Sequence, residues 1–232
     1  TFHSLLYPGS YRNKSQGMDW QDAWRLDENN LLVGGAEWRE TKVDNSGTYT
    51  GRSVNNKALY LENRMTLDEK WTLTPGFRYD THSMFGNQTT PRTALNYKMD
   101  ESTNMYVSWG KVFNAPNTDD LFLPDSGYTA GNPNLKPETG TTTTIGINKK
   151  LDEKTQVTAS YFHNQLNDAI NWADDGTGKY IPSNVDSQRK NGMEIEIRTI
   201  LSPNWSASGA YSYLKVENKQ GGASEYTRET KN

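Results

Sequence analysis

Side chains along this chain alternate between apolar and polar with a period of two, over runs of about ten residues. The run 71–80 reads WTLTPGFRYD, and the run 193–198 reads MEIEIR. A period of two indicates β-strands, because successive side chains point to opposite faces of a sheet. Strands of soluble proteins are typically about 5–6 residues long, whereas a tilted strand that crosses a membrane needs about ten. The pattern therefore predicts an all-β, antiparallel fold with strands of membrane-crossing length.

The alternation and the turn residues between the runs divide the chain into about ten predicted strands, arranged as five hairpins. The predicted strands are Gln16–Leu26, Leu31–Thr41, Asn55–Leu67, Trp71–Thr81, Arg92–Met99, Asn104–Phe113, Thr139–Lys149, Gln156–Asp168, Lys190–Ile200 and Trp205–Glu217.

Short and long junctions alternate between these strands. The short turn LDEK at 67–70 recurs unchanged at 151–154, and similar turns lie at 26–29, 99–102 and 201–204. The predicted long junctions are 43–53, 82–90, 114–136, 168–187 and the stretch from 218, and the polar end at 227–232 is expected to be a loop. Short turns at one end and long loops at the other are typical of outer-membrane barrels, in which the short side is periplasmic.

The composition agrees with a membrane barrel better than with a compact soluble core. Only 33% of the 232 residues are hydrophobic, yet there are 13 Tyr and 7 Trp. A barrel wall needs one apolar face, a wet inner face and aromatic girdles at both interfaces. The net charge of −3 provides no polycationic face for nucleic acid, which is therefore not an expected partner.

No apolar run is long enough for a membrane helix, no signal peptide is recognised at Thr1, and Cys is absent. The chain opens within a strand pattern, so we expect it to be a fragment of a larger protein. Without Cys there is no disulfide, no thiolate metal site and no Cys nucleophile.

The segment 132–138, which reads NPNLKPE, predicts a rigid, non-helical elbow. Pro133 and Pro137 fix their own backbone angles and make the residues before them extended. The elbow follows the sequence VFNAP at 112–116 by about twenty residues and leads into a Thr-rich strand.

These two segments resemble the paired boxes of TonB-dependent outer-membrane receptors, in which they flank one external loop. The residues that carry this resemblance are Phe113, Ala115, Pro116, Asn132, Pro133, Asn134, Leu135, Pro137 and Glu138. Four further segments match in the order of the family: 71–80, 91–95, 159–170 and 184–194.

The resemblance implies a fold and a place within it. Receptors of this family have a plugged barrel of 22 strands, of which residues 1–232 would be a middle part. The plug domain and the terminal strands would lie outside this chain.

The resemblance also implies a function. The chain would be part of an active transporter in the outer membrane of a Gram-negative bacterium. That transporter imports a ferric siderophore, or else cobalamin or haem. Its partners would be the iron–siderophore complex, the lipid bilayer, and the TonB complex through the absent plug. No cofactor is expected. From another class of function, a passive porin or a soluble carbohydrate-binding β-protein stays open.

Candidate ligand contacts lie in the predicted external loops. The loop 117–131 offers Asp119 and Asp120 as carboxylates that can address cations, and Phe122 and Tyr128 as aromatic surfaces. For any one of them an ordinary solvated loop is the simpler interpretation. Other candidates are His82, Trp172 and Tyr180. For Trp172 and Tyr180 a place in the aromatic girdle is favoured, and a lone His at position 82 is more often plain polar surface.

Other chemistry receives little support. The loop 117–131 lacks the His that haem receptors place there, and the chain has only His3, His82 and His163, so haem is less favoured as the ligand. The segment 174–179 lacks the oxygen-ligand pattern of an EF-hand, and no metal site is predicted. No nucleophile elbow, phosphate loop or zinc motif indicates an enzyme. Glu194 and Glu196 share one strand face, which is expected to be a wet barrel interior that also carries Arg198.

Overall fold

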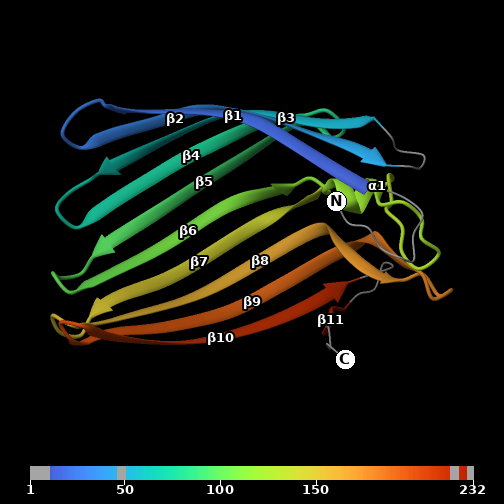
Figure 1. The fold of residues 1–232 in the computed structure, drawn as a ribbon. Coiled ribbons are helices and arrows are strands. Elements are labelled where there is room, and N and C mark those ends of the chain that lie inside the picture. The colour runs from blue at the N-terminus through green and yellow to red at the C-terminus, as the bar shows by residue number, and fades with distance from the viewer. Residues whose placement is uncertain (1–10, 46–50, 220–224, 229–232) are drawn as a thin grey trace.

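The computed structural model describes residues 11–45, 51–219 and 225–228. They form one antiparallel sheet of 11 strands that follow one another in chain order, with β1 at one edge and β11 at the other. Figure 1 shows this sheet strongly curved, like an open portion of a barrel wall. The predicted all-β, antiparallel barrel segment is therefore confirmed.

The strands are longer than predicted, and most extend toward the end where the long junctions lie. Their bounds are β1 Tyr11–Arg25, β2 Asn30–Asn45, β3 Arg52–Thr66, β4 Trp71–His82, β5 Gly86–Lys98, β6 Thr103–Asn114, β7 Glu138–Lys150, β8 Thr155–Asp174, β9 Tyr180–Ser202, β10 Trp205–Lys219 and β11 Thr227–Arg228. One helix, α1 (Thr118–Phe122), interrupts the junction between β6 and β7.

Tight turns join the strands at one end of the sheet, which we call the turn end. In the turns at 26–29, 67–70, 99–102 and 151–154, the Oδ1 atom of an aspartate accepts a hydrogen bond from the backbone N–H two residues later, at 2.7–2.8 Å. An aspartate closes a turn in this way because its short side chain mimics a backbone carbonyl. We call the opposite end, with the longer connections, the loop end.

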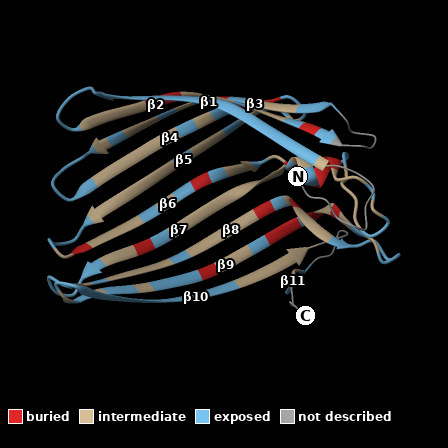
Figure 2. Ribbon diagram, in the orientation of Figure 1, coloured by how far each residue is buried: buried red, intermediate tan, exposed pale blue. Residues whose placement is uncertain are grey.

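The two faces of the sheet differ in polarity. One face, which we call outward, carries large apolar side chains that are exposed, and these form the apolar belt. The belt consists of Trp20, Trp24, Leu59, Leu61, Trp71, Phe77, Tyr79, Val107, Trp109, Ile145, Tyr161, Met193, Ile195, Ile197, Tyr211 and Tyr213. An apolar surface of this extent is unfavourable in water and matches the lipid-facing band of a barrel. Figure 2 shows how little of the sheet is buried.

The other face, which we call inward, carries ion pairs. Arg92 pairs with Glu62 at 2.8 Å, and Arg198 pairs with Glu196 at 2.5 Å. The second pair agrees with the wet interior predicted for that strand. Among the described residues no helix is long and apolar enough to cross a membrane.

Several predicted junctions are wrong. The long loop expected at 82–90 is a three-residue turn, because Gly86 adopts a φ of +70° and starts β5. The loop expected at 168–187 is mostly strand, since β8 continues to Asp174 and β9 begins at Tyr180. Pro182 is tolerated inside β9 because β9 pairs with β10 only from Ser187 onward, so the missing N–H of Pro182 removes no bond to β10.

The end of the chain also differs from the prediction. Thr227 and Arg228, expected in a loop, form the short strand β11, which pairs with Asn218 and Glu217. Residues 229–232 lie outside the described part of the chain, and so do residues 46–50 of the predicted junction 43–53.

The main core lies at the loop end, where the connections fold together. Val43, Leu121, Phe122 and Leu135 form a buried cluster, with partly buried side chains packed around it. A second cluster contains Leu166, Ala169 and Val185. Burying each large aliphatic side chain contributes about 1.5–3 kcal/mol, so the first cluster holds the connection between β6 and β7 against the sheet, and the second packs β8 and β9 together.

Candidate functional site

The connection 115–137 between β6 and β7, which we call the inner loop, folds back over the inward face at the loop end. Its helix α1 begins with a capping box: the Asn117 side chain accepts from the backbone N–H of Asp119 and Asp120, at 2.8 Å each. The Asp120 carboxylate returns the contact by accepting from the Asn117 backbone N–H at 3.1 Å. This exchange satisfies backbone donors that a short helix leaves free.

Asp119 ties the inner loop to β1. Its Oδ1 atom accepts hydrogen bonds from the Tyr11 hydroxyl at 2.7 Å and from the Asn13 amide at 2.8 Å. Burial, together with the bond to the Asp119 carboxylate, raises the pKa of the Tyr11 phenol to about 12. The phenol is therefore protonated and able to donate at neutral pH.

Asp120 ties the same loop to β8. Its buried carboxylate accepts a hydrogen bond from the Trp172 indole N–H at 2.9 Å. The backbone carbonyl of Asp120 accepts from the Asn132 N–H at 2.7 Å. Trp172 thus points to the inner loop, and the girdle interpretation of Trp172 is wrong. Together the neighbouring aspartates join β1 to β8, strands separated by six others in the sheet.

The elbow at 132–138 is pinned to β9. The Asn132 side-chain amide donates to the Pro182 carbonyl at 3.0 Å. The Asn184 amide accepts from the Lys136 N–H at 2.9 Å and donates to the Lys136 carbonyl at 3.0 Å, as a neighbouring strand would. Leu135 inserts into the main core between these contacts, with 3% of its surface exposed. The elbow therefore fixes where the inner loop ends.

Glu138 closes the elbow at the start of β7. Its two carboxylate oxygens accept from the Asn114 side chain at 2.7 Å and from the Ile170 N–H at 2.8 Å. The second contact lies beside Asp168, whose φ of +53° interrupts the pairing of β8 with β9. A carboxylate at Glu138 thus joins three strands, which explains why the motif ends on an acid.

A recess of about 630 Å³ lies beside the inner loop on the inward face of β2–β6. Its polar wall is an ion-pair network in which Arg78 contacts Glu37 and Asp80, at 3.0 Å each. Asn56 donates to Asp80 at 2.7 Å, and Arg39 lies 3.4 Å from Glu37. Fixed polar groups in a concave site are what a ligand-binding surface needs for orientation.

His82 lies at the edge of this recess, at the end of β4. Only 7% of its surface is exposed, and its ring stacks on Phe85 with centroids 4.9 Å apart. Phe113 approaches the same ring edge-on at 6.5 Å. Burial lowers the pKa of His82, while the charge of Asp80 opposes that shift.

Tyr128 and Tyr180 lie next to each other at the loop end. The Tyr180 N–H donates to the Tyr128 carbonyl at 2.8 Å, while both side chains are exposed. Next to them Lys179 binds Asp125, and this contact lowers the pKa of the Asp125 carboxyl.

The structure thus brings some of the predicted residues together and separates others. Asp119, Asp120 and Trp172 meet around α1. Phe122 is different, since it is 4% exposed in the main core and its ring packs against protein; ligand contact by Phe122 therefore requires the core to open.

Sequence reasoning missed the ion-pair network and the residues that receive the inner loop. Arg78 and Asp80 share the inward face of one strand, and that spacing was the available signal. No local pattern indicated that Tyr11 and Asn13 would reach Asp119.

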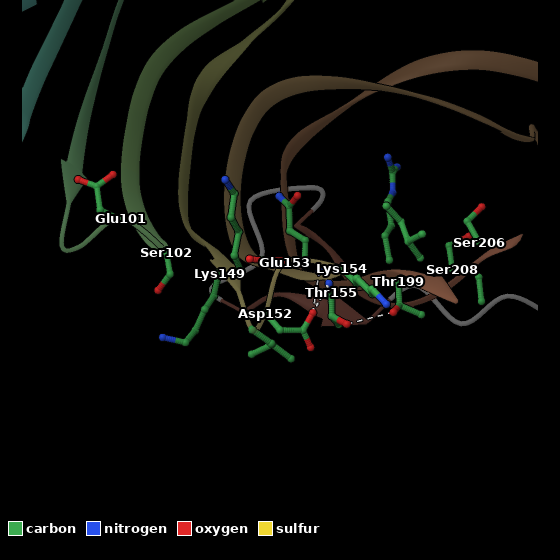
Figure 3. A pocket seen from close by; sticks show the side chains of 16 residues that line it. Glu101, Ser102, Lys149, Asp152, Glu153, Lys154, Thr155, Thr199, Ser206 and Ser208 are labelled. Carbon is green, nitrogen blue, oxygen red and sulfur yellow. Dashed lines mark hydrogen bonds between the residues drawn. The ribbon is translucent and has the colours of Figure 1, made fainter. Parts of the chain in front are cut away.

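A second recess lies at the turn end, with a volume of about 1120 Å³. Figure 3 shows that its labelled side chains come from turns and strand ends, with the Asp152 carboxylate bonded within its own turn. Thr155 and Thr199 share a hydrogen bond of 3.0 Å there. These contacts close the turn itself, and the charges are mixed in sign. Within the described ranges no group of three or more His, Asp or Glu side chains is arranged to hold a metal ion.

Comparisons with known proteins match almost the whole chain. A family model described as "TonB dependent receptor-like, beta-barrel" matches residues 2–231. The vitamin B12 transporter BtuB of Vibrio vulnificus is 33% identical over 77% of this chain and 29% of its own length. The ferrienterobactin receptor of Escherichia coli K12 is 26% identical over 84% of this chain and 32% of its own length. This chain therefore spans about a third or less of these relatives.

A solved structure agrees with the sheet. The siderophore receptor PirA from Pseudomonas aeruginosa superimposes with a TM-score of 0.71 and 22% identity, over 95% of this chain and 45% of PirA. At that identity the likeness supports the fold alone.

Proposed function

We propose, because this chain belongs to the TonB-dependent receptor family, that it is part of an outer-membrane receptor that binds and actively imports a ferric siderophore. The observation that carries the proposal is the inner loop, which joins β1 to β8 through Asp119 and Asp120 beside a polar recess. The relatives named above are transporters and receptors. The fold of this chain provides part of a barrel wall, with a recess near its loop end.

The proposed receptor is larger than this chain. We propose that residues 1–232 are a middle part of a 22-strand barrel whose lumen is filled by a plug. The short share of each relative that the chain covers supports this. The TonB complex would act through the plug. The intact mass of the natural protein tests the idea: a mass well above 26.3 kDa is expected, and a mass equal to this chain would contradict it.

The ligand is proposed from the character of the recess. Arg39 and Arg78 present guanidinium groups that can address the oxygen-rich, anionic surface of a ferric complex. His82, Tyr128 and Tyr180 are proposed as further contacts, the tyrosines because their rings are exposed at the loop end. Asp119, Asp120 and Trp172 are proposed to shape the site by holding the inner loop.

Cobalamin is the second candidate, because the relative with 33% identity is a vitamin B12 transporter. A growth assay in cells that lack their own receptors separates the two ligands. Growth under iron limitation with added siderophore supports the first candidate, and cobalamin-dependent growth supports the second.

The recess itself is tested by Arg78→Gln in the full receptor. We expect binding of the ferric siderophore to weaken by about tenfold, since a charged hydrogen bond contributes about 1.5–3 kcal/mol. The matched control is Arg198→Gln, which removes another inward ion pair, to Glu196, nearer the turn end. Equal binding by the two variants would contradict a site at the recess. Import that persists after the proton gradient is collapsed would indicate a passive porin.

A further inference from the structure

We infer that the outward face holds a binding site for a phosphate-bearing lipid of the surrounding membrane, with an acyl chain lying over Ala36 and the phosphate at Lys57. The inference goes beyond ligand import, and it rests on the membrane location proposed above. It starts from a hollow of about 490 Å³ on the outward face of β1–β4.

The strand register places this hollow. Trp20 pairs with Ala36, and Ala36 pairs with Leu59, so one small side chain lies between two large ones. In the next outward-facing row toward the loop end, Trp38 pairs with Lys57. The alanine therefore leaves a depression in the apolar belt, and Lys57 stands at its outer rim.

The lining favours a hydrocarbon chain. Met18, Trp20 and Leu59 are 75%, 57% and 61% exposed, and Tyr79 borders the same hollow. An acyl chain in the depression would give these side chains the dispersion contacts that the missing bulk at Ala36 leaves unfilled. A free protein partner is a weaker fit, because the hollow lies within the belt that lipid surrounds.

The charge at the rim favours a phosphate. Lys57 is exposed, and no carboxylate of the described residues forms an ion pair with it. The acids adjacent in sequence to the lining residues, Asp19, Glu37 and Asp80, face inward by strand alternation, and Glu37 is engaged there by Arg78. Glu40 faces outward, and its carboxylate is engaged by Gln16, Ser53 and Lys42. Within the described part of the chain, Lys57 is thus a cation without an ion-pair partner, at the edge of an apolar groove.

The wider charge distribution agrees. Beyond the belt at the loop end, the outward-facing basic residues are Arg12, Lys14, Lys42, Lys57, Lys111, Arg189, Lys215 and Lys219, against the acids Glu40, Asp44 and Glu217. The turns at the other end carry Asp27, Glu28, Asp68, Glu69, Asp100, Glu101, Asp152 and Glu153, against Lys70 and Lys154. The adjoining strand ends at the turn end add Lys98, Lys149 and Lys150. The outward face at the loop end is therefore the more basic of the two regions, and an anionic headgroup is attracted to it.

The experiment uses the full receptor in phosphatidylcholine vesicles, with phosphatidic acid that carries brominated acyl chains. Bromine quenches tryptophan fluorescence on contact, and Trp20 and Trp38 both line the hollow. For the wild type we expect quenching to saturate at a lower fraction of brominated phosphatidic acid than of brominated phosphatidylcholine.

Two variants dissect the site, each with a matched control. Lys57→Gln should weaken phosphatidic acid binding by about fivefold, as expected for one basic residue at a membrane surface, whereas Lys154→Gln at the turn end should not. Ala36→Leu fills the hollow and should abolish the preference, whereas Ala159→Leu fills an outward position on β8 and should preserve it.

The result that overturns the inference is a wild type without preference for phosphatidic acid, or variants that behave like their controls. Displacement of the lipid by an equal concentration of inorganic phosphate would also overturn it, because the acyl chain would then contribute nothing. Quenching by brominated phosphatidylcholine is a separate readout. If it is absent, the membrane location fails; if it is present without a preference, only the lipid site fails.

Discussion

At the turn end the chain reverses within a few residues, and each of four reversals is held by an aspartate whose partner lies two residues away. At the loop end the contacts that hold the inner loop join residues 108, 52 and 50 positions apart, in the pairs Tyr11–Asp119, Asp120–Trp172 and Asn132–Pro182. One end closes hairpins by local chemistry, and the other builds a site from distant strands. We therefore expect substitutions at the loop end to act across the sheet, and substitutions at the turn end to stay local.

The largest difference between the ends is expected when a leucine at each end is replaced by alanine. Leu121→Ala opens a cavity in the main core, where Leu121 is fully buried, and should cost about 2–5 kcal/mol in the docking of the inner loop. Faster hydrogen exchange of the amides of α1 would report this. Leu151→Ala, in a turn where the side chain is 55% exposed, is the control and should leave exchange unchanged. If both variants exchange alike, the inner loop is not held by its core.

A smaller effect is expected from the pH dependence of the hydrogen bond from Tyr11 to Asp119, which we call the clamp between β1 and the inner loop. The pKa of Tyr11 is raised to about 12 in the folded protein, from about 10 in an unfolded chain. A raised pKa means that the clamp contributes stability below pH 10 and loses it as the pH rises from about 10 to about 12.

Ultraviolet titration of tyrosinate, compared with that of Tyr11→Phe, should reveal one phenol that ionises near pH 12. In Asp119→Ala its pKa should fall toward the ordinary value. A Tyr11 that titrates with the exposed tyrosines in the wild type would show that the clamp is absent.

The smallest effect is expected at the turn aspartates. The hydrogen bond from the Lys154 N–H lowers the pKa of the Asp152 carboxyl. This hydrogen bond therefore stabilises the turn at every pH above the ordinary pKa of an aspartate. The support is lost as the pH falls through the lowered pKa. Asp152→Ala should speed exchange only at the amides of Lys154 and Thr155, which donate to the carboxylate. A change that spreads to the inner loop would break the distinction between the ends.

The same distinction explains what the sequence could predict. The turn LDEK at 67–70 and 151–154 contains its own closing residue, so short windows located most hairpins at the turn end. The alternation of apolar and polar side chains located the strands, because successive side chains of a strand point to opposite faces of the sheet. The lengths of β8 and β9 were missed, because the outer parts of these strands pair with each other from Ala169–Val185 to Asp174–Tyr180, and the alternation of side chains did not indicate that pairing.

The site was predictable only in part. The elbow at 132–138 was recognised, but its partners Pro182, Asn184 and Ile170 come from strands that sequence spacing does not connect. The acids of the inner loop were named as ligand contacts, and the structure shows that Asp119 and Asp120 bind Tyr11 and Trp172. Their proposed role is accordingly to hold the inner loop in place.

The central claim is tested most directly by determining which end of the sheet is exposed at the cell surface. The 232 residues contain no Cys, so single cysteines can be placed at exposed Tyr128, at the loop end, and at exposed Glu153, in a turn. Intact cells are then treated with a maleimide that does not cross membranes. We predict that Tyr128→Cys is labelled and that Glu153→Cys is labelled only after the cells are opened. Labelling of Glu153→Cys in intact cells, with Tyr128→Cys protected, would contradict an outer-membrane receptor with its ligand site at the loop end.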